Sequence, residues 1–356
     1  MWMTDLLALT AELVDIASPS LGEALLVDHL QAELVRVAWL DVERVGDNLV
    51  ARTHLDRPQR LVLAGHTDTV PANGNDRARI DGDVLWGLGA ADMKGGLAVM
   101  FELARSVPEP ALDVTYAFYA AEEIAAEHNG LGHLLRDRPE LLAGDVALLG
   151  EPTGGSLEAG CQGTMRLAVT LGGRRAHTAR PWMGVNAVHR LAPLLAAIAA
   201  YPHREPVLSG CQFREALSAV GVEGGVAANV VPDRVVLTVN HRFAPDRTPA
   251  EAEAHVREVL GPHLLDDDEI TVLDVAGGAA PALDHPVLAA LVARNELGVS
   301  AKLGWTDVAR FAALGVPAAN FGPGEPTVAH MADERVSRAQ LESVHGALAD
   351  LLERGG

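Results

Sequence analysis

Helix-like and strand-like patterns alternate along most of this chain, and the alternation limits the available folds more than any other feature. Before residue 163, the expected elements are helices at Leu6–Ala17 and Gly22–Val37 and strands at Asn48–Thr53, Arg60–Gly65, Val114–Tyr119 and Val146–Gly150. After residue 277 come a helix at Pro286–Asn295, a strand at Ala318–Phe321 and a helix at Ser337–Glu353. This pattern predicts an α/β fold with a mostly parallel sheet and helices on both faces.

The middle of the chain follows a different order. Its expected elements are a strand at Met165–Leu171, a helix at Asn186–Tyr201, strands at Leu217–Glu223 and Arg234–Phe243, a helix at Thr248–Leu260 and a strand at Ile270–Val275. A β-α-β-β-α-β order is typical of ferredoxin-like α+β domains. We therefore predict a catalytic α/β domain formed by residues 1–163 and 277–356, with a small α+β domain, residues 164–276, inserted into it.

The charge balance excludes whole classes of partner. The 356 residues carry a formal net charge of −20, which disfavours nucleic acid and anionic membranes. A small anionic substrate stays compatible, because local arginines can reverse the field within a cleft. Cys161 and Cys211 are too few for a disulfide framework and lack metal-site spacing. The N-terminal segment has no basic n-region, and no apolar run could span a bilayer, so we expect a soluble cytoplasmic protein.

The expected strand at Arg60–Gly65 leads directly into a histidine and an aspartate. His66 and Asp68 lie two residues apart, so an extended backbone points both side chains to the same face. A carboxylate beside a histidine can fix the tautomer of an imidazole that binds metal. The alternative for this motif alone is a His–Asp pair that caps a turn.

Further carboxylates follow other expected strands or their loops. Asp92 precedes a glycine-rich helix start, Glu122 and Glu123 follow one strand, and Glu151 follows another. Alone, Asp92 suits a helix N-cap, and the others suit solvated loops. In doubly wound sheets, however, the carboxyl ends of the strands form the ligand-binding edge. Packing these charges together without counter-ions would cost several kcal/mol per charge. Divalent cations would remove that cost.

A second histidine, His330, follows the loop GPGEP late in the chain. Two imidazoles and three carboxylates suit two Zn²⁺ ions that share a bridging carboxylate. The four positive charges of the two ions would then face the three negative charges of Asp92, Glu123 and Glu151. Glu122 is not needed as a ligand in this arrangement and is available to accept a proton.

The combined motifs resemble the zinc-dependent M20 metallopeptidase and deacylase family from about residue 5 to 350. The motifs are HTDTVP, GAADMKGG, the EE pair, GEPT, RRAHTA, NVVP and the late histidine. Longer stretches, such as VNHRFAPDR and GWTDVARFAALGVPAANFGPG, resemble the actinobacterial desuccinylases of that family. The resemblance implies a zinc exopeptidase-like fold with an inserted lid and dimerisation domain.

For the metal site, the resemblance implies two Zn²⁺ ions, with Co²⁺ as a substitute. Its residue assignments are His66, Asp92 and Glu151 at one ion, and His330, Asp92 and Glu123 at the other, with Asp92 bridging. Asp68 would orient His66, and Glu122 would be the general acid and base. The family also commonly has a cis peptide bond after the bridging aspartate, here Asp92–Met93.

For the inserted domain, the resemblance implies that His177 reaches across a homodimer to stabilise an oxyanion. A turn histidine is the alternative for His177. Asn229, Arg242 and Thr306 resemble substrate contacts, and the planar fork of an arginine suits a carboxylate. Dimerisation would occur through the inserted domain.

The implied activity is hydrolysis of N-succinyl-LL-2,6-diaminopimelate to succinate and LL-2,6-diaminopimelate, in lysine and diaminopimelate biosynthesis. Three departures leave the substrate pocket less defined. Leu88 and Trp305 replace an arginine and a glycine of the family motifs, and Cys161–Gln162 stands where some desuccinylases carry arginine. The alternatives are acetylornithine deacetylase or another aminoacyl peptidase of the family, and a non-catalytic zinc-binding protein. A nucleotide-binding dehydrogenase is disfavoured, because GLGAAD lacks the third glycine of the dinucleotide fingerprint.

Overall fold

The computed structural model describes residues 4–356, which form two compact units. The first unit comprises the described residues up to 159 together with 281–300 and 310–356, and the second comprises 160–280 and 301–309. Thr306 therefore belongs to the second unit. The predicted domain boundaries, 1–163 with 277–356 and 164–276, stay predictions.

The first unit is built on a mixed sheet with strand order β1-β2-β6-β3-β7-β16-β8-β15. The strands are β1 (Asp41–Val45), β2 (Asn48–Arg52), β6 (Asp113–Tyr119), β3 (Arg60–His66), β7 (Val146–Leu149), β16 (Ala318–Asn320), β8 (Leu157–Cys161) and β15 (Val299–Lys302). The central strands β6, β3, β7 and β16 are mutually parallel, whereas β1, β2 and β8 pair antiparallel. The predicted mostly parallel sheet is thus confirmed.

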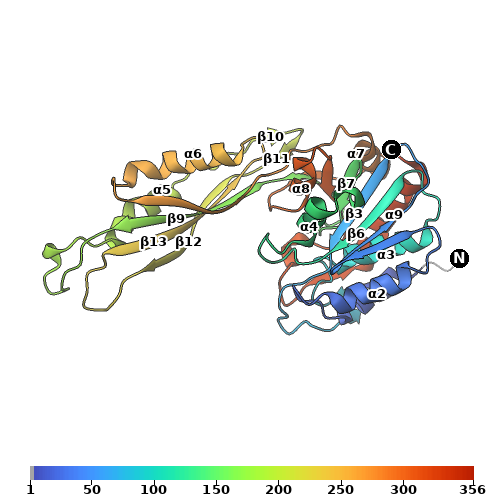
Figure 1. Cartoon of the computed structure of the whole chain (residues 1–356), viewed down its shortest axis with the longest axis horizontal. Helices are drawn as coiled ribbons and strands as arrows, with labels where there is room; N and C mark the ends of the chain where they lie inside the picture. The colour runs from blue at the N-terminus through green and yellow to red at the C-terminus, as the bar shows by residue number, and fades with distance from the viewer. Residues whose placement is uncertain (1–3) are drawn as a thin grey trace. The chain divides into compact units, whose positions relative to one another are not determined.

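Helices bury the central strands on both faces, as Figure 1 shows for this unit. The helices are α1 (Leu6–Asp15), α2 (Ala24–Leu34), α3 (Lys94–Ser106), α4 (Gly130–Asp137), α7 (Pro286–Asn295), α8 (Val308–Ala313) and α9 (Arg338–Arg354). In β3, Leu61 and Leu63 join the large apolar core shared with α1, α2, α3, α7 and α9. The alternate residues Val62 and Ala64 are also buried, which is the pattern of a strand covered on both sides.

The second unit contains an antiparallel sheet of order β12-β13-β9-β14 with two main helices. Its elements are β9 (Gly163–Gly172), α5 (Leu191–Ala199), β12 (Ala216–Gly224), β13 (Arg234–Phe243), α6 (Pro249–Leu260) and β14 (Glu269–Ala276), with a short hairpin β10 (Val207–Leu208) and β11 (Cys211–Gln212). Alternate residues of the strands pack with α5 and α6 in a separate apolar core. The predicted ferredoxin-like order is confirmed.

One helix of the second unit begins later than the sequence predicts. The side chain of Asn186 accepts hydrogen bonds from the backbone N–H groups of Val188 and His189. A 3₁₀ turn at Val188–Arg190 follows, and α5 starts only at Leu191. The predicted start at Asn186 was wrong because asparagine readily bonds to its own backbone and so favours turns over helix interiors.

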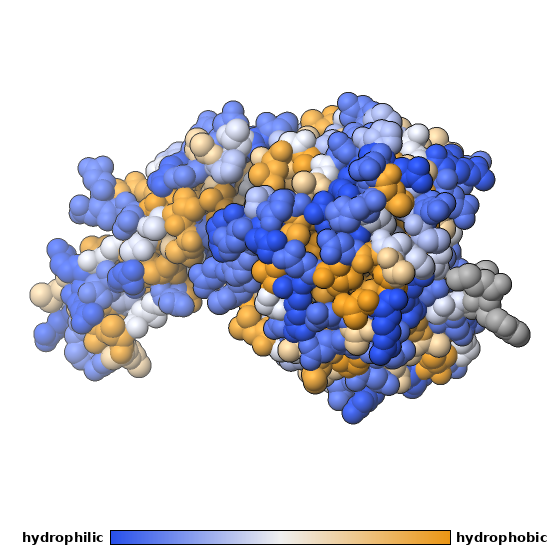
Figure 2. Space-filling view, turned by 45° about the vertical axis from the view of Figure 1, so that its right-hand side comes forward, coloured by the Kyte–Doolittle hydropathy of each residue, from blue (hydrophilic) through white to orange (hydrophobic). Residues whose placement is uncertain are grey.

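No helix within residues 4–356 combines the length and apolar character needed to cross a membrane. Figure 2 shows hydrophilic residues over most of the face in view, with hydrophobic residues gathered in limited patches. Most large apolar side chains instead belong to the two cores.

The approach of α3 to β7 depends on a glycine. A Cβ on Gly96 would lie 2.2 Å from the carbonyl oxygen of Gly150, which is backbone and cannot rotate away. We expect Gly96→Ala to destabilise the protein by about 1–3 kcal/mol or more through overpacking. Urea unfolding would measure this loss. Gly346→Ala is the matched control, since this α9 glycine has no neighbour within 4 Å of a Cβ and alanine favours helices by about 1 kcal/mol. Equal stability of the two variants would contradict the packing argument.

Candidate metal centre

Four neighbouring segments deliver polar side chains to one edge of the first sheet. His66 ends β3, Glu122 and Glu123 lie shortly after β6, and Glu151 follows β7. Because β6, β3 and β7 are adjacent and parallel, their carboxyl ends meet at that edge. Asp92 lies in the turn before α3. Its peptide bond to Met93 is cis, as the family resemblance implied.

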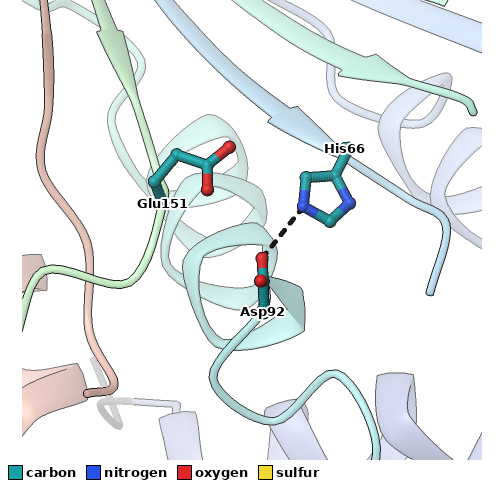
Figure 3. A group of neighbouring side chains, drawn as sticks. All are labelled: His66, Asp92 and Glu151. Atoms are coloured by element: carbon teal, nitrogen blue, oxygen red, sulfur yellow. Dashed lines mark hydrogen bonds and ion pairs between the residues drawn. The ribbon is translucent and has the colours of Figure 1, made fainter. Parts of the chain in front are cut away.

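The carboxylate of Asp92 lies between two imidazoles. Its Oδ1 is 3.1 Å from Nε2 of His66, and its Oδ2 is 3.5 Å from Nε2 of His330. His330 comes from the loop after the 3₁₀ turn Pro326–Val328, far away in sequence. Figure 3 shows His66, Asp92 and Glu151 pointing toward one another from three separate segments. One carboxylate therefore presents each of its oxygens to a different histidine.

The side chains that could hold metal fall into overlapping groups whose ligand atoms lie within 4.8 Å of one another. The groups are His66 with Asp92 and Glu151, Asp92 with Glu123 and His330, and His66 with Glu122 and Glu123. The first two groups contain the same residues as the ligand sets that the family resemblance implied. Imidazole nitrogens and carboxylate oxygens are the donor set that zinc and similar divalent cations accept. The residues present therefore fit a metal pair.

The carboxylates create a field that favours cations. Burial lowers the pKa of His66, but hydrogen bonds with Asp68 and Asp92 outweigh it and leave the pKa well above its ordinary value. The hydrogen bond to Asp92 raises the pKa of His330 to about 9, with help from Glu123. Burial raises the pKa of Glu123. A metal ion binds neutral imidazole, so its binding must displace these protons.

Asp68 contacts His66 differently from what the motif suggests. The main-chain carbonyl of Asp68 lies 3.0 Å from Nδ1 of His66, whereas the carboxylate Oδ1 is 3.6 Å away. The carboxylate instead accepts the backbone N–H groups of Glu122 and Glu123, at 2.9 and 3.0 Å, and the hydroxyl of Ser20. Asp68 thus fixes the backbone of the acidic pair as well as the imidazole. Its orienting role in the reaction stays a prediction.

Two buried glutamates at this edge were not singled out from the sequence. Glu23 accepts the backbone N–H groups of Leu21 and Ala121. Ala121 has a left-handed φ of 59°, which is uncommon for a residue with a side chain, and it directly precedes Glu122. Glu334 accepts three backbone N–H groups in the turn that carries Asp92. Neither glutamate lies in a recognisable motif, and only their burial marks them.

The predicted substrate residues all lie in the second unit and do not gather at one place. His177 and Asn229 lie on adjoining segments beyond the Gly172 end of β9, where Thr178 donates its N–H to the carbonyl of Asn229 at 3.1 Å. Both are exposed. Arg242 lies near the opposite end of the sheet, where β13 pairs with Thr164 of β9. The buried hydroxyl of Thr306 has no hydrogen-bond partner among the described residues.

The chain is similar to a known peptidase family and to sequences named as desuccinylases. Residues 62–354 match the profile of the peptidase family M20/M25/M40. A Mycobacterium tuberculosis protein, provisionally named succinyl-diaminopimelate desuccinylase DapE, is 48% identical over 98% of this chain and 97% of its own length. The succinyl-diaminopimelate desuccinylase of Corynebacterium glutamicum is 44% identical over 98% of this chain and 96% of its own length.

Comparison with solved structures supports the fold. A tripeptidase of Staphylococcus aureus aligns with a TM-score of 0.80 at 22% identity, covering 98% of this chain and 97% of that one. An M20 family metallo-carboxypeptidase of Sulfolobus solfataricus aligns with a TM-score of 0.76 at 16% identity, covering 98% and 99%. At these identities the likeness confirms the predicted fold class, and we draw no substrate from it.

Proposed function

The chain belongs to the peptidase family M20/M25/M40, and from that membership we propose that it hydrolyses N-succinyl-LL-2,6-diaminopimelate to succinate and LL-2,6-diaminopimelate. The observation that supports this choice of substrate is the 44% identity to a named succinyl-diaminopimelate desuccinylase over 98% of the chain. The reaction is the cleavage of an amide bond, and it would serve diaminopimelate and lysine biosynthesis. A cytoplasmic location fits this role.

We assign the metal as a pair of Zn²⁺ ions, with Co²⁺ as a substitute. His66, Asp92 and Glu151 would hold one ion, and His330, Asp92 and Glu123 the other. Support comes from the Asp92 carboxylate, whose two oxygens lie 3.1 and 3.5 Å from different imidazoles. When bound, such ions supply Lewis-acid chemistry, polarising the scissile carbonyl and making water more acidic.

Glu122 supplies the proton transfers in this proposal. Its backbone is held by Asp68, which leaves the side chain at the metal edge beside Glu123 and His66. The carboxylate accepts a proton from the attacking water and later gives it to the leaving amine. Removing a general acid and base of this kind typically costs a factor of about 10²–10⁴.

The second unit supports a homodimer. His177 and Asn229 lie past one end of β13, and Arg242 lies near the other end, roughly 25–30 Å away at the rise of an extended strand. Because both sets belong to the same compact unit, no motion of that unit as a whole can bring them to the same small substrate. A substrate that contacts Arg242 and His177 must take them from two copies of the chain. An active monomer in sedimentation would contradict this arrangement.

The departures from the family motifs bear on the succinyl pocket. Cys161 and Gln162 are both buried, and the amide oxygen of Gln162 accepts the backbone N–H of Arg214. These two residues therefore serve the interior of the second unit and do not offer a cation to a substrate carboxylate. Arg242 is half-buried and donates a hydrogen bond to the side chain of Asn240. We assign to this arginine the contact with the substrate carboxylate.

A substrate panel tests the proposal directly. Chelated protein restored with Zn²⁺ should cleave N-succinyl-LL-2,6-diaminopimelate with a kcat/KM at least about 100-fold above that for N-acetylornithine or dipeptides, because a site that pairs a buried carboxylate rejects ligands lacking it. Release of succinate, acetate and free amine would be followed in parallel. Faster cleavage of acetylornithine or a dipeptide would assign the chain to a sibling activity. No cleavage with intact metal binding would favour a non-catalytic zinc protein.

A further inference from the structure

Glu334 connects the two chain segments that carry the central metal-binding candidates. Its carboxylate accepts the backbone N–H of Gly89 at 3.0 Å through Oε2, and those of Ala91 and Asp92 at 2.9 Å each through Oε1. The residue is 1% exposed. It also lies four residues after His330. One side chain therefore joins the turn that presents Asp92 to the loop that presents His330.

The turn before α3 needs an external acceptor. Met93, at the N-cap position of α3, makes no side-chain capping hydrogen bond. Buried N–H groups without partners each cost about 1–3 kcal/mol, so the N–H groups of this turn require an oxygen. The backbone N–H of Lys94 donates to the local carbonyl of Gly89. The N–H groups of Gly89, Ala91 and Asp92, in contrast, all donate to the carboxylate of Glu334. The main chain at Asp92 is thus positioned by a residue from the opposite segment.

Keeping a negative charge on Glu334 costs free energy at this buried position. A neutral acceptor would avoid that cost, so the presence of a carboxylate points to a role that needs its charge or both of its oxygens. Burial and the nearby Asp92 carboxylate both oppose a second negative charge. The ammonium of Lys94 attracts Glu334, and Lys94 is itself buried, with a hydrogen bond to the carbonyl of Ile16 at 2.7 Å. A full carboxylate is nevertheless suited to three converging N–H donors, because both of its oxygens only accept.

We infer that Glu334 is a positioning residue that sets the placement of Asp92 relative to His330 and thereby the affinity of the shared divalent-cation pair. This inference rests on the proposed function only for the identity of the metal. The carboxylate of Glu334 bonds the backbone N–H of Asp92, so it acts on this ligand through the main chain. Partners of this outer kind typically contribute a factor of about 10–100 to metal affinity.

Glu334→Gln tests the role with almost no change of shape. The amide keeps one acceptor oxygen but directs an NH₂ group at one of the three donors, so the turn must shift. Metal-stripped protein titrated with Zn²⁺ against a chromophoric chelator should bind at least one ion about 10–100-fold more weakly. The visible spectrum of the Co²⁺-loaded variant should change as well. Turnover should recover at excess Zn²⁺ with KM unchanged.

Glu325→Gln is the matched control, because Glu325 is an exposed acid of the same loop whose carboxylate accepts a hydrogen bond from the side chain of Gln340. It should bind Zn²⁺ like the parent chain. Unchanged Zn²⁺ affinity and an unchanged Co²⁺ spectrum in folded Glu334→Gln would overturn the inference. If that variant does not fold, Glu334→Asp replaces it, and parental affinity there would overturn the inference equally. These metal readouts do not require desuccinylation, so failure of the proposed function would be seen separately.

Discussion

Glu122→Ala is expected to lose nearly all turnover and to keep its metal. The proposed reaction needs a proton taken from water and a proton given to the leaving amine, and both transfers pass through this carboxylate. We expect kcat to fall by about 10²–10⁴-fold or more. The fold of the acidic pair should survive, because Asp68 holds the backbone N–H groups of residues 122 and 123 and not their side chains. Steady-state kinetics and metal content per chain would be measured on the same preparation.

The metal measurement decides between two readings of the geometry. Glu122 also lies in a group with His66 and Glu123 whose ligand atoms are within 4.8 Å, so it could serve as a ligand. Loss of an ion in Glu122→Ala would move it from proton transfer to coordination. Glu127→Ala provides the control, since this glutamate follows in the same loop with its side chain 79% exposed. Parental turnover in Glu122→Ala would contradict either role.

The sequence predicted the sheet edge well because strand periodicity is a local signal. Buried parallel strands give continuous apolar runs, and β3, β6 and β7 were all expected within about a residue of their ends. The residues that follow such runs must lie at one edge once the strands are parallel. By contrast, β1 has the polar sequence DVERV and is only partly buried, so its pairing with β2 left no apolar pattern to detect.

The supporting residues of the site could not be predicted because their partners are backbone groups far away in sequence. Glu334 bonds N–H groups more than 240 positions earlier, and Glu23 bonds Ala121, 98 positions later. Any residue type offers a backbone N–H, so no motif marks the recipient. The approach of His330 to Asp92 was reached from donor chemistry and family resemblance, since the loop that carries it has no strand pattern.

Asp92→Ala is expected to weaken both metal sites at once. Its two carboxylate oxygens face different imidazoles, so its removal takes a ligand from each proposed set. Glu151→Ala and Glu123→Ala, which each remove a ligand from one set, should weaken one ion only. We expect affinity to fall by more than the factor of about 10–100 typical of outer partners, and turnover to fall with it. Metal content after dialysis against a weak chelator would give ions per chain for all three variants.

A second measurement on metal-free protein separates loss of the bridge from loss of the fold. The hydrogen bond to Asp92 is the largest contribution that raises the pKa of His330 to about 9. In Asp92→Ala that pKa should fall toward the ordinary value of 6.5, whereas unfolding would bring every shifted histidine to its ordinary value together. Proton NMR of the imidazoles across pH 5–10 would follow the change, with His345 as internal reference, because burial lowers the pKa of that histidine and Asp92 does not contribute to its shift. Because a bridging carboxylate must touch both ions, retention of two tightly bound ions by Asp92→Ala would rule out the shared-ligand arrangement, whatever the rate.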